Sequence, residues 1–423
     1  MIARKKGILV INDGVGDRPL EIFGNRTPLE AGEFETFKRL AREGVTGLMD
    51  PLSPGIRVGT DVGHLALFGY NPLKTYWGRG PIEAAGVNIA LEPGDIAFRC
   101  NFATIDPAGP EGTWIVTNRR AGRIREGTEE LAKAVSAIRL DADTQIIFRP
   151  GTEHRAVLVF SNRNLSAEVT ASDPGEGHEG EPVRIVEPRK KGFKMAERTA
   201  ELLNEFTRKS YEVLSHHPVN LKRIREGKPP ANIVLIRGAG MQTKMRSITE
   251  RFNIFGACIT GESTIMGIAR IAGFSVLAAP EFTANVDTDI EKKCTFVLEG
   301  LENHDLVVVH FKGPDICGHD GKPEEKRLFL EREDRALGKV LEEVSKRRDC
   351  YIALTGDHST PCEIGEHTAD PVPCVVWGRG VLTDEVTSYG ERSCQRGGLG
   401  RITANQFLLT LLDLMDVTFR FGT

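Results

Sequence analysis

Three short apolar runs stand out along this chain, and each one ends in polar residues that could bind a ligand. The runs are GILVIND, DLVVVHFKGPD and YIALTGDH, which end at Asp13, at Asp315 and at Asp357 with His358. Uninterrupted runs of this length, rich in β-branched residues, are typical of strands buried on both faces of a parallel sheet. An amphipathic stretch, residues 322–347, predicts a covering helix. The pattern therefore predicts an α/β fold with a doubly wound, mostly parallel sheet.

The ends of these runs predict where ligands would gather. In open α/β sheets, ligands bind outside the carboxyl ends of the strands. We therefore expect the acidic residues that close the three runs to share one edge of the sheet, although the first lies far from the other two in sequence.

The middle of the chain has a different pattern. Short alternating segments (AFRCNFATI, GTWIVTN, TQIIFRP, HRAVLVFS and AEVTAS) are interrupted by Gly, Pro and Asp, and a long helical pattern follows at residues 194–219. Short strands with frequent turns predict a smaller α+β domain. Because the apolar runs lie on either side of it, we expect an insertion at residues 97–237 within a discontinuous domain, 1–96 and 238–423, with NIVLIRGAG returning the chain.

Size and composition narrow the classes of protein. At 423 residues the chain is longer than a single hydrophobic core usually supports, so we expect two domains. With 40% hydrophobic residues, 27% charged residues and a net charge of −4, the composition suggests neither binding to nucleic acid nor binding to a membrane surface. No apolar run approaches the roughly 20 residues of a membrane span, and the N-terminal apolar stretch is too short for a signal peptide. The eight cysteines include no C-x-x-C pair. We expect a cytoplasmic protein without disulfides.

Several potential metal ligands accompany the three runs. Oxygen and imidazole groups of this kind suit Mn²⁺ or Zn²⁺ and also allow Mg²⁺. Their joint placement after predicted strands favours a site for two divalent ions, which suits phosphoryl transfer. The candidate residues are Asp13, Thr60, Asp315, His319, Asp357, His358 and His367.

Thr60 has two interpretations within the stretch GTDVGH. Its hydroxyl could cap the helix predicted by the following HLALFGY, by accepting an early backbone N–H. It could instead be a nucleophile, because a helix N-terminus also favours a phosphoryl group. Neither a Walker-type motif nor a dinucleotide fingerprint is present, so the sequence does not support nucleotide binding.

The successive motifs of the chain resemble a known family. The motifs are INDGVGDRPL, TPLEA, PGIRVGTDVGHLALFGYNP, GRGPIEAAG, PGDIAFRCNFAT, NRRAGR, HRAVLV, HPVNLKRIREGKPPAN, RGAG, PDICGHDG and DHSTP…EHTADPVP. In this order, from the first predicted strand to about Val376, they resemble the archaeal-type cofactor-independent (2,3-bisphosphoglycerate-independent) phosphoglycerate mutases of the alkaline phosphatase superfamily.

The resemblance implies a phosphatase-like metal domain with an inserted phosphotransferase domain. It assigns one metal ion to Asp315, His319 and His367. It assigns the other ion to a second set of residues, namely Asp13, Asp357, His358 and Thr60. Thr60 would accept the phosphoryl group of 3-phosphoglycerate and return it to the 2-hydroxyl of glycerate, in glycolysis and gluconeogenesis and without 2,3-bisphosphoglycerate.

The resemblance also implies residues that handle the substrate, a small phosphorylated acid. His64 and His154 are candidates for orienting it or transferring protons. Arginine side chains suit phosphate and carboxylate because their planar donors match both anions. The arginines in family motifs are Arg119, Arg120, Arg155 and Arg237.

The chain departs from the family pattern at four positions. Thr60 stands for serine, Met266 for lysine, Asn118 for aspartate, and no histidine follows Asp173-Pro174. These changes leave an alternative open, a paralogous metal-dependent phosphohydrolase or phosphotransferase that acts on another small phosphorylated or phosphonylated acid. A third hypothesis is a non-catalytic metal-binding protein descended from such an enzyme.

Overall fold

The computed structural model describes residues 4–175, 177–241, 246–420 and 422. Its internal contacts divide the chain into two compact units. The discontinuous unit consists of Met1–Tyr76 and Met245–Thr423, and the inserted unit consists of Trp77–Lys244.

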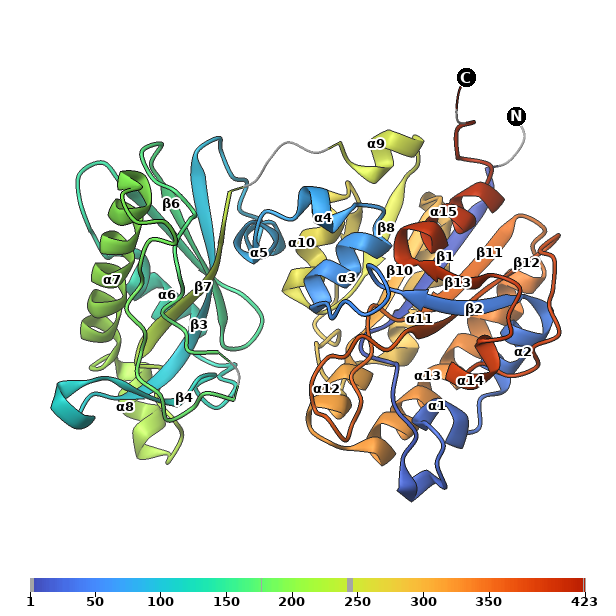
Figure 1. Cartoon of the computed structure of the whole chain (residues 1–423), viewed down its shortest axis with the longest axis horizontal. Helices are drawn as coiled ribbons and strands as arrows, with labels where there is room; N and C mark the ends of the chain where they lie inside the picture. The colour runs from blue at the N-terminus through green and yellow to red at the C-terminus, as the bar shows by residue number, and fades with distance from the viewer. Residues whose placement is uncertain (1–3, 176, 242–245, 421, 423) are drawn as a thin grey trace. The chain divides into compact units, whose positions relative to one another are not determined.

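An eight-stranded sheet forms the centre of the discontinuous unit (Figure 1). Its order is β13-β2-β12-β11-β1-β10-β8-β9, and only β12 runs against its neighbours. The three apolar runs are the adjacent strands β11, β1 and β10, which confirms the predicted parallel core. The strand bounds are β1 Lys6–Asn12, β2 Val45–Asp50, β8 Gly256–Ile259, β9 Ser275–Leu277, β10 Leu306–Phe311, β11 Cys350–Thr355, β12 Val372–Gly378 and β13 Gly400–Thr403.

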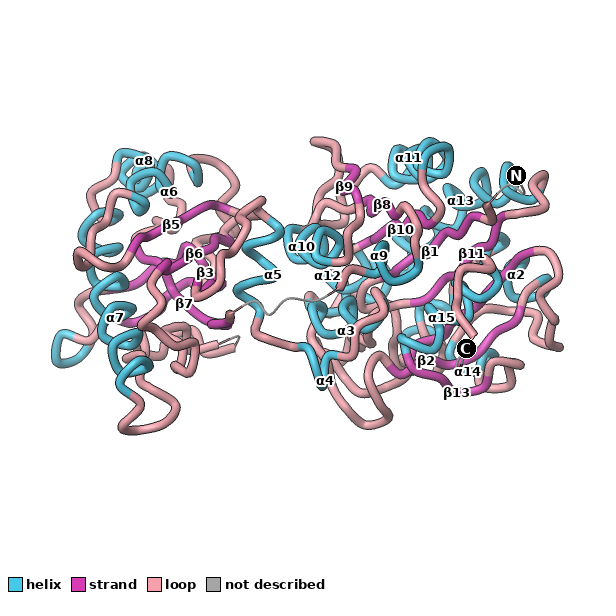
Figure 2. The backbone as a smooth tube through the Cα atoms, turned by 90° about the horizontal axis from the view of Figure 1, so that it is seen from above, coloured by secondary structure: helices cyan, strands magenta, loops and turns pink. Residues whose placement is uncertain are grey.

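Helices cover both faces of this sheet, as a doubly wound fold requires (Figure 2). One face carries α2 (Glu35–Glu43), α11 (Ile290–Asn303) and α13 (Pro323–Ser345). The other carries α3 (Thr60–Leu67), α10 (Ser263–Ile271) and α15 (Ala404–Leu414). Shorter helices complete the unit: α1 Pro28–Ala31, α4 Pro72–Thr75, α9 Ile248–Phe252, α12 Gly313–His319, α14 Glu391–Cys394 and the 3₁₀ turn Glu21–Phe23.

The long helix α13 shows how the local sequence produces these layers. Pro323 begins the helix at a position that needs no N–H donor, and Glu324 and Glu325 lie in the first turn, where the helix dipole favours negative charge. Phe329 and Val340 are buried on its apolar side. The helix that the amphipathic pattern predicted is therefore confirmed.

The inserted unit contains a five-stranded antiparallel sheet. Helices α6 (Thr128–Ser136) and α7 (Lys194–Leu214) pack together with the sheet core, which includes Phe98, Phe160 and Phe206. The remaining helices are α5 (Arg79–Gly86) and α8 (Pro218–Arg225), and a 3₁₀ turn spans Pro110–Gly112. The strands are β3 Asp95–Asp106, β4 Ile115–Asn118, β5 Gln145–Pro150, β6 Arg155–Ser161 and β7 Ile233–Gly240.

The division between the units differs from the expected boundaries. Helix α5 belongs to the inserted unit because it packs on β3, β6 and β7. Strand β7, the NIVLIRGAG segment, also remains in this unit because it pairs with β3. The segment AEVTAS forms no strand; Val169 makes only an isolated bridge to Pro188.

Two further observations bear on class. Within the described residues, no helix is long and apolar enough to cross a membrane. All eight cysteines are buried and unpaired. Burial raises the pKa of thiols such as Cys100, so these side chains act as small apolar groups in the core.

Gly80 provides a test of the packing of α5. A Cβ atom at this position would collide with the backbone carbonyl of Ala97 on β3. We expect Gly80→Ala to lower the thermal midpoint by about 4–10 °C, because the backbones of α5 and β3 cannot move apart without a loss of packing. Gly300→Ala is the matched control, since its Cβ would meet only side chains, at 3.3 Å or more. Equal midpoints for the two variants in a thermal melt would contradict this packing.

Candidate functional site

The carboxyl ends of three adjacent strands bring three carboxylates together in the discontinuous unit. Asp13 directly follows β1, Asp357 follows β11, and Asp315 lies in α12 after β10. Asp13 and Asp357 are completely buried, and Asp315 is 2% exposed. The N–H of Gly14 donates to Asp357 Oδ1 at 3.0 Å, which joins the loop after β1 to the one after β11. The common edge expected from the sequence is therefore present.

Imidazole groups complete two sets of possible metal ligands. Asp13, Asp357 and His358 form one set, and Asp315, His358 and His367 form another, with donor atoms of each set within 4.8 Å of one another. His358 Nε2 lies 3.4 Å from Asp13 and 3.2 Å from Asp357. The chemistry of these donors fits divalent ions such as Mn²⁺ or Zn²⁺.

The hydrogen bonds of the histidines turn their Nε2 atoms toward the carboxylates. His319 Nδ1 donates to the carbonyl of Gly365 at 2.7 Å, and His367 Nδ1 donates to that of Val58 at 2.8 Å. Their two Nε2 atoms lie 3.2 Å apart and within 3.5 Å of Asp315 Oδ1. Both Nε2 atoms therefore face the same carboxylate, and backbone-anchored Nδ1 atoms are typical of metal ligands.

Electrostatics favour the metal-binding forms of Asp315 and His358, whereas His367 is shifted toward its protonated form. Burial raises the pKa of Asp315, but Lys312 and His367 outweigh it and hold this pKa well below its usual range. Burial lowers the pKa of His358 to about 4, although Asp357 opposes the shift. For His367, the bond to Asp315 overcomes burial and raises the pKa. Ionised carboxylates and a neutral His358 are ready ligands at neutral pH.

Thr60 lies inside this cluster, and the capping interpretation of its hydroxyl is wrong. The N-cap of α3 is Gly59, and Thr60 is the first residue of the helix. Its Oγ1 lies 3.2 Å from His358 Nε2 and also accepts a hydrogen bond from Lys312 Nζ at 3.2 Å. The side chain is 5% exposed. Because the backbone of α3 needs no bond from it, the hydroxyl is available to the cluster.

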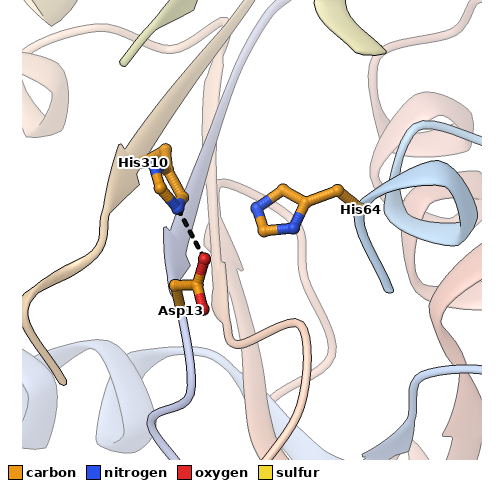
Figure 3. A group of neighbouring side chains, drawn as sticks. All are labelled: Asp13, His64 and His310. Atoms are coloured by element: carbon orange, nitrogen blue, oxygen red, sulfur yellow. Dashed lines mark hydrogen bonds and ion pairs between the residues drawn. The ribbon is translucent and has the colours of Figure 1, made fainter. Parts of the chain in front are cut away.

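Two further histidines lie against the carboxylates, and Figure 3 shows His310 hydrogen-bonded to Asp13 with His64 nearby. His310, on β10, donates from Nε2 to Asp13 Oδ2 at 2.9 Å, while its Nδ1 accepts from Thr260 at 3.0 Å. His64, on α3, donates from Nδ1 to the Thr60 carbonyl at 2.8 Å and lies 3.1 Å from Asp357 Oδ2. The structure thus places His64 against a carboxylate in the discontinuous unit.

Sequence reasoning missed His310 and Lys312. Both lie in the apolar run of β10, where polar side chains interrupt residues that are otherwise buried and hydrophobic. The two positions are separated by one residue and stand just before Asp315, with His310 inside β10 and Lys312 directly after it. That spacing, next to Asp315, was the available signal.

The arginines predicted to bind substrate occur in the inserted unit. Arg119 donates to Asp173 at 2.6 Å, and Arg237 lies 3.6 Å from the same carboxylate. Asn118 accepts the N–H groups of Arg120 at 3.1 Å and Gly122 at 2.9 Å, so it shapes this turn. An aspartate oxygen could accept the same bonds, and therefore the change to asparagine keeps the turn.

Arg99 is an additional member of this cluster. It lies on β3 opposite Arg237 of β7, is 4% exposed, and its buried Nε and Nη1 atoms have no hydrogen-bond partner. Burial, together with the charge of Arg119, lowers the pKa of Arg237 to about 9. Arg99 Nε lies 3.6 Å from Glu83 Oε1, beyond hydrogen-bond reach, and buried donors of this kind suit an anion.

His154 lies beside the arginines. It is 7% exposed, and its Nδ1 is buried without a hydrogen-bond partner. Burial lowers its pKa, and Arg155 and Arg99 lower it further, so the ring is neutral at physiological pH. A neutral imidazole can orient a ligand through hydrogen bonds, but it is a much weaker proton donor than an imidazolium.

Comparison with known proteins identifies the family of the chain. Residues 41–220 match the family model described as 2,3-bisphosphoglycerate-independent phosphoglycerate mutase. Curated proteins of that name from Methanopyrus kandleri and Methanobrevibacter smithii are 44% and 42% identical, each over 99% of this chain and 98% and 100% of their own lengths. The chain belongs to the 2,3-bisphosphoglycerate-independent phosphoglycerate mutase family.

Solved structures of similar proteins support the same membership. A Pyrococcus horikoshii protein is 35% identical with a TM-score of 0.84, over 100% of both chains. The cofactor-independent phosphoglycerate mutase of Thermoplasma acidophilum is 34% identical with a TM-score of 0.66, over 97% of this chain and 100% of that one. The mixed α/β fold is thus shared with both proteins along nearly the whole chain.

Gly63 tests how α3 reaches the cluster. A Cβ atom here would lie 2.5 Å from the carbonyl oxygen of Asp357, so only glycine allows this approach. We expect Gly63→Ala to displace Thr60 and His64 and to weaken Mn²⁺ binding at least ~10-fold, measured by calorimetric titration. Gly300→Ala should leave the affinity unchanged. Unaltered binding by the Gly63 variant would show that the position of α3 does not matter to the site.

Proposed function

We propose that this enzyme interconverts 3-phosphoglycerate and 2-phosphoglycerate through a phosphothreonine at Thr60. The observation that carries the proposal is the Thr60 hydroxyl, which lies 3.2 Å from His358 Nε2 within a buried cluster of carboxylates and imidazoles. An alcohol in such a cluster at the first residue of a helix suits phosphoryl transfer. The name shared by the relatives indicates the substrate and independence from 2,3-bisphosphoglycerate.

The proposed ligands form two sets. Asp315, His319 and His367 would hold one divalent ion. Asp13, Asp357, His358 and Thr60 would hold the other. Two ions so placed would neutralise charge on the transferred phosphoryl group. His310 and His64 fix the orientation of Asp13 and Asp357, and this support keeps the ligands at a constant geometry.

The chain's own groups account for the remaining steps. In the first transfer, the Thr60 hydroxyl loses its proton as Oγ1 bonds to phosphorus, and the 3-oxygen takes up a proton as its bond to phosphorus breaks. In the second, the 2-hydroxyl of glycerate loses its proton as its oxygen bonds to phosphorus, and Thr60 Oγ1 regains a proton as it is released. We propose that the arginine cluster of the inserted unit holds the carboxylate or phosphate meanwhile, because its buried donors need an anion.

This scheme assigns one task to each unit. The discontinuous unit is a metal-binding, phosphatase-like domain, and the inserted unit is the phosphotransferase domain that binds substrate. We assign the enzyme to glycolysis and gluconeogenesis in the cytoplasm.

Thr60 can be tested by removing its hydroxyl without changing its shape. We expect Thr60→Val to lose at least ~1,000-fold of turnover in an enolase-coupled assay with 3-phosphoglycerate and Mn²⁺, because no phosphoenzyme can form. Thr60→Ser should remain active, and mass spectrometry should find phosphate on residue 60. Thr207→Val is the control, since that hydroxyl bonds only within α7, to the Leu203 carbonyl at 2.9 Å.

Three results would count against the proposal. Full turnover by Thr60→Val would exclude this nucleophile. A requirement for added 2,3-bisphosphoglycerate would exclude the proposed route. Release of inorganic phosphate that exceeds mutase turnover would favour the alternative, a paralogous phosphohydrolase or phosphotransferase.

Arg237 tests the anion site separately from the metal site. We expect Arg237→Met to raise KM for 3-phosphoglycerate about 10-fold or more, because a charge-assisted bond to the substrate is lost. The affinity for Mn²⁺ should not change. Arg225→Met removes an exposed arginine of α8 and should leave KM unaltered. A KM for Arg237→Met equal to that of this control would remove Arg237 from the binding site.

A further inference from the structure

Lys312 is a buried cation at the centre of the carboxylate cluster. It follows β10, caps the N-terminus of α12 and is 6% exposed. Its Nζ lies 2.6 Å from Asp315 Oδ2 and 3.0 Å from Asp13 Oδ1. The same nitrogen donates to Thr60 Oγ1 at 3.2 Å. An ammonium group has three N–H donors, so these contacts use its full capacity.

These contacts join residues from separate parts of the site. Asp13 and Asp315 belong to different proposed ligand sets, and Thr60 is the proposed nucleophile. A fourth group, Glu262, lies 3.9 Å from Lys312 and forms the N-cap of α10, the helix that carries Met266. Lys312 therefore supplies a positive charge beside Thr60 from the β10 side of the site.

The electrostatic reason is the cost of burying carboxylates. An ionised carboxylate removed from water needs a partner charge, and divalent ions provide it only once they have bound. Before that, the carboxylates would repel one another and spread apart. A lysine that bridges two of them removes this repulsion while it leaves His358 and His367 in place.

We propose that Lys312 is a positioning residue that takes the place of the ionic charge in the metal-free protein and keeps Asp13, Asp315 and Thr60 assembled for ion binding. The inference rests on the ligand sets of the proposed function. An ordinary structural ion pair would stabilise the protein equally with and without ions. A place-holding cation matters chiefly when ions are absent.

Stability measured with and without metal separates these roles. In the presence of a chelator, we expect Lys312→Met to lower the thermal midpoint by about 5–10 °C, because it leaves buried carboxylates unpaired. Saturating Mn²⁺ should reduce this loss by at least half. Lys326→Met is the matched control: its buried Nζ bonds Asp17 at 2.8 Å and the carbonyls of Gly16 and Thr360, and it contacts no proposed ligand directly, so its loss should depend on Mn²⁺ far less.

A double variant tests the cause and covers a failure of Lys312→Met to fold. With chelator present, adding Asp315→Asn to Lys312→Met should restore part of the midpoint, although Asp315→Asn alone lowers it. If the losses in thermal midpoint of the two single variants simply add in chelator, the proposal is overturned. It is also overturned if the wild type binds Mn²⁺ but Mn²⁺ does not reduce the loss in midpoint caused by Lys312→Met.

The proposed function fails by a different result. If Mn²⁺ does not stabilise the wild type, the metal site is wrong, and the double-variant measurement in chelator still decides whether Lys312 holds the carboxylates together.

Discussion

The burial of three carboxylates at one edge of a parallel sheet is the constraint on which the rest of the site depends. Asp13, Asp315 and Asp357 reach this edge because β1, β10 and β11 are neighbours. Charges at this depth persist only when they are paired or bound to metal ions. The imidazoles and Lys312 that surround them answer this need, which explains why so many polar groups lie within an otherwise apolar core.

The position of α3 is a second consequence of the same edge. Its backbone approaches that of Asp357 so closely that residue 63 must be glycine. This contact brings Thr60 beside His358 and lets His64 reach Asp357. The stretch GTDVGH therefore combines a helix start, a close backbone approach and two functional side chains in six residues.

The two units carry opposite electrostatic demands. The discontinuous unit concentrates carboxylates that require cations, whereas the inserted unit concentrates arginines whose buried donors require an anion. The proposed phosphorylated acid and divalent ions would satisfy these demands. Asn118 also shows that a departure from the family pattern can be structurally silent, since its oxygen shapes the turn before Arg120 as an aspartate oxygen would.

The sequence by itself determined the parallel strands and the chemistry at their ends, because uninterrupted apolar runs report burial and the residues after them must lie at the sheet edge. It did not determine which side chains contact one another in the folded protein. His310 and Arg99 lie within strands and Lys312 directly follows one, and a pattern of burial does not show which buried groups these side chains contact. The role of Thr60 at the start of α3 and the place of α5 in the inserted unit were likewise decided by tertiary packing. Contacts between residues far apart in sequence decide these features, and the local hydrophobic pattern does not predict such contacts.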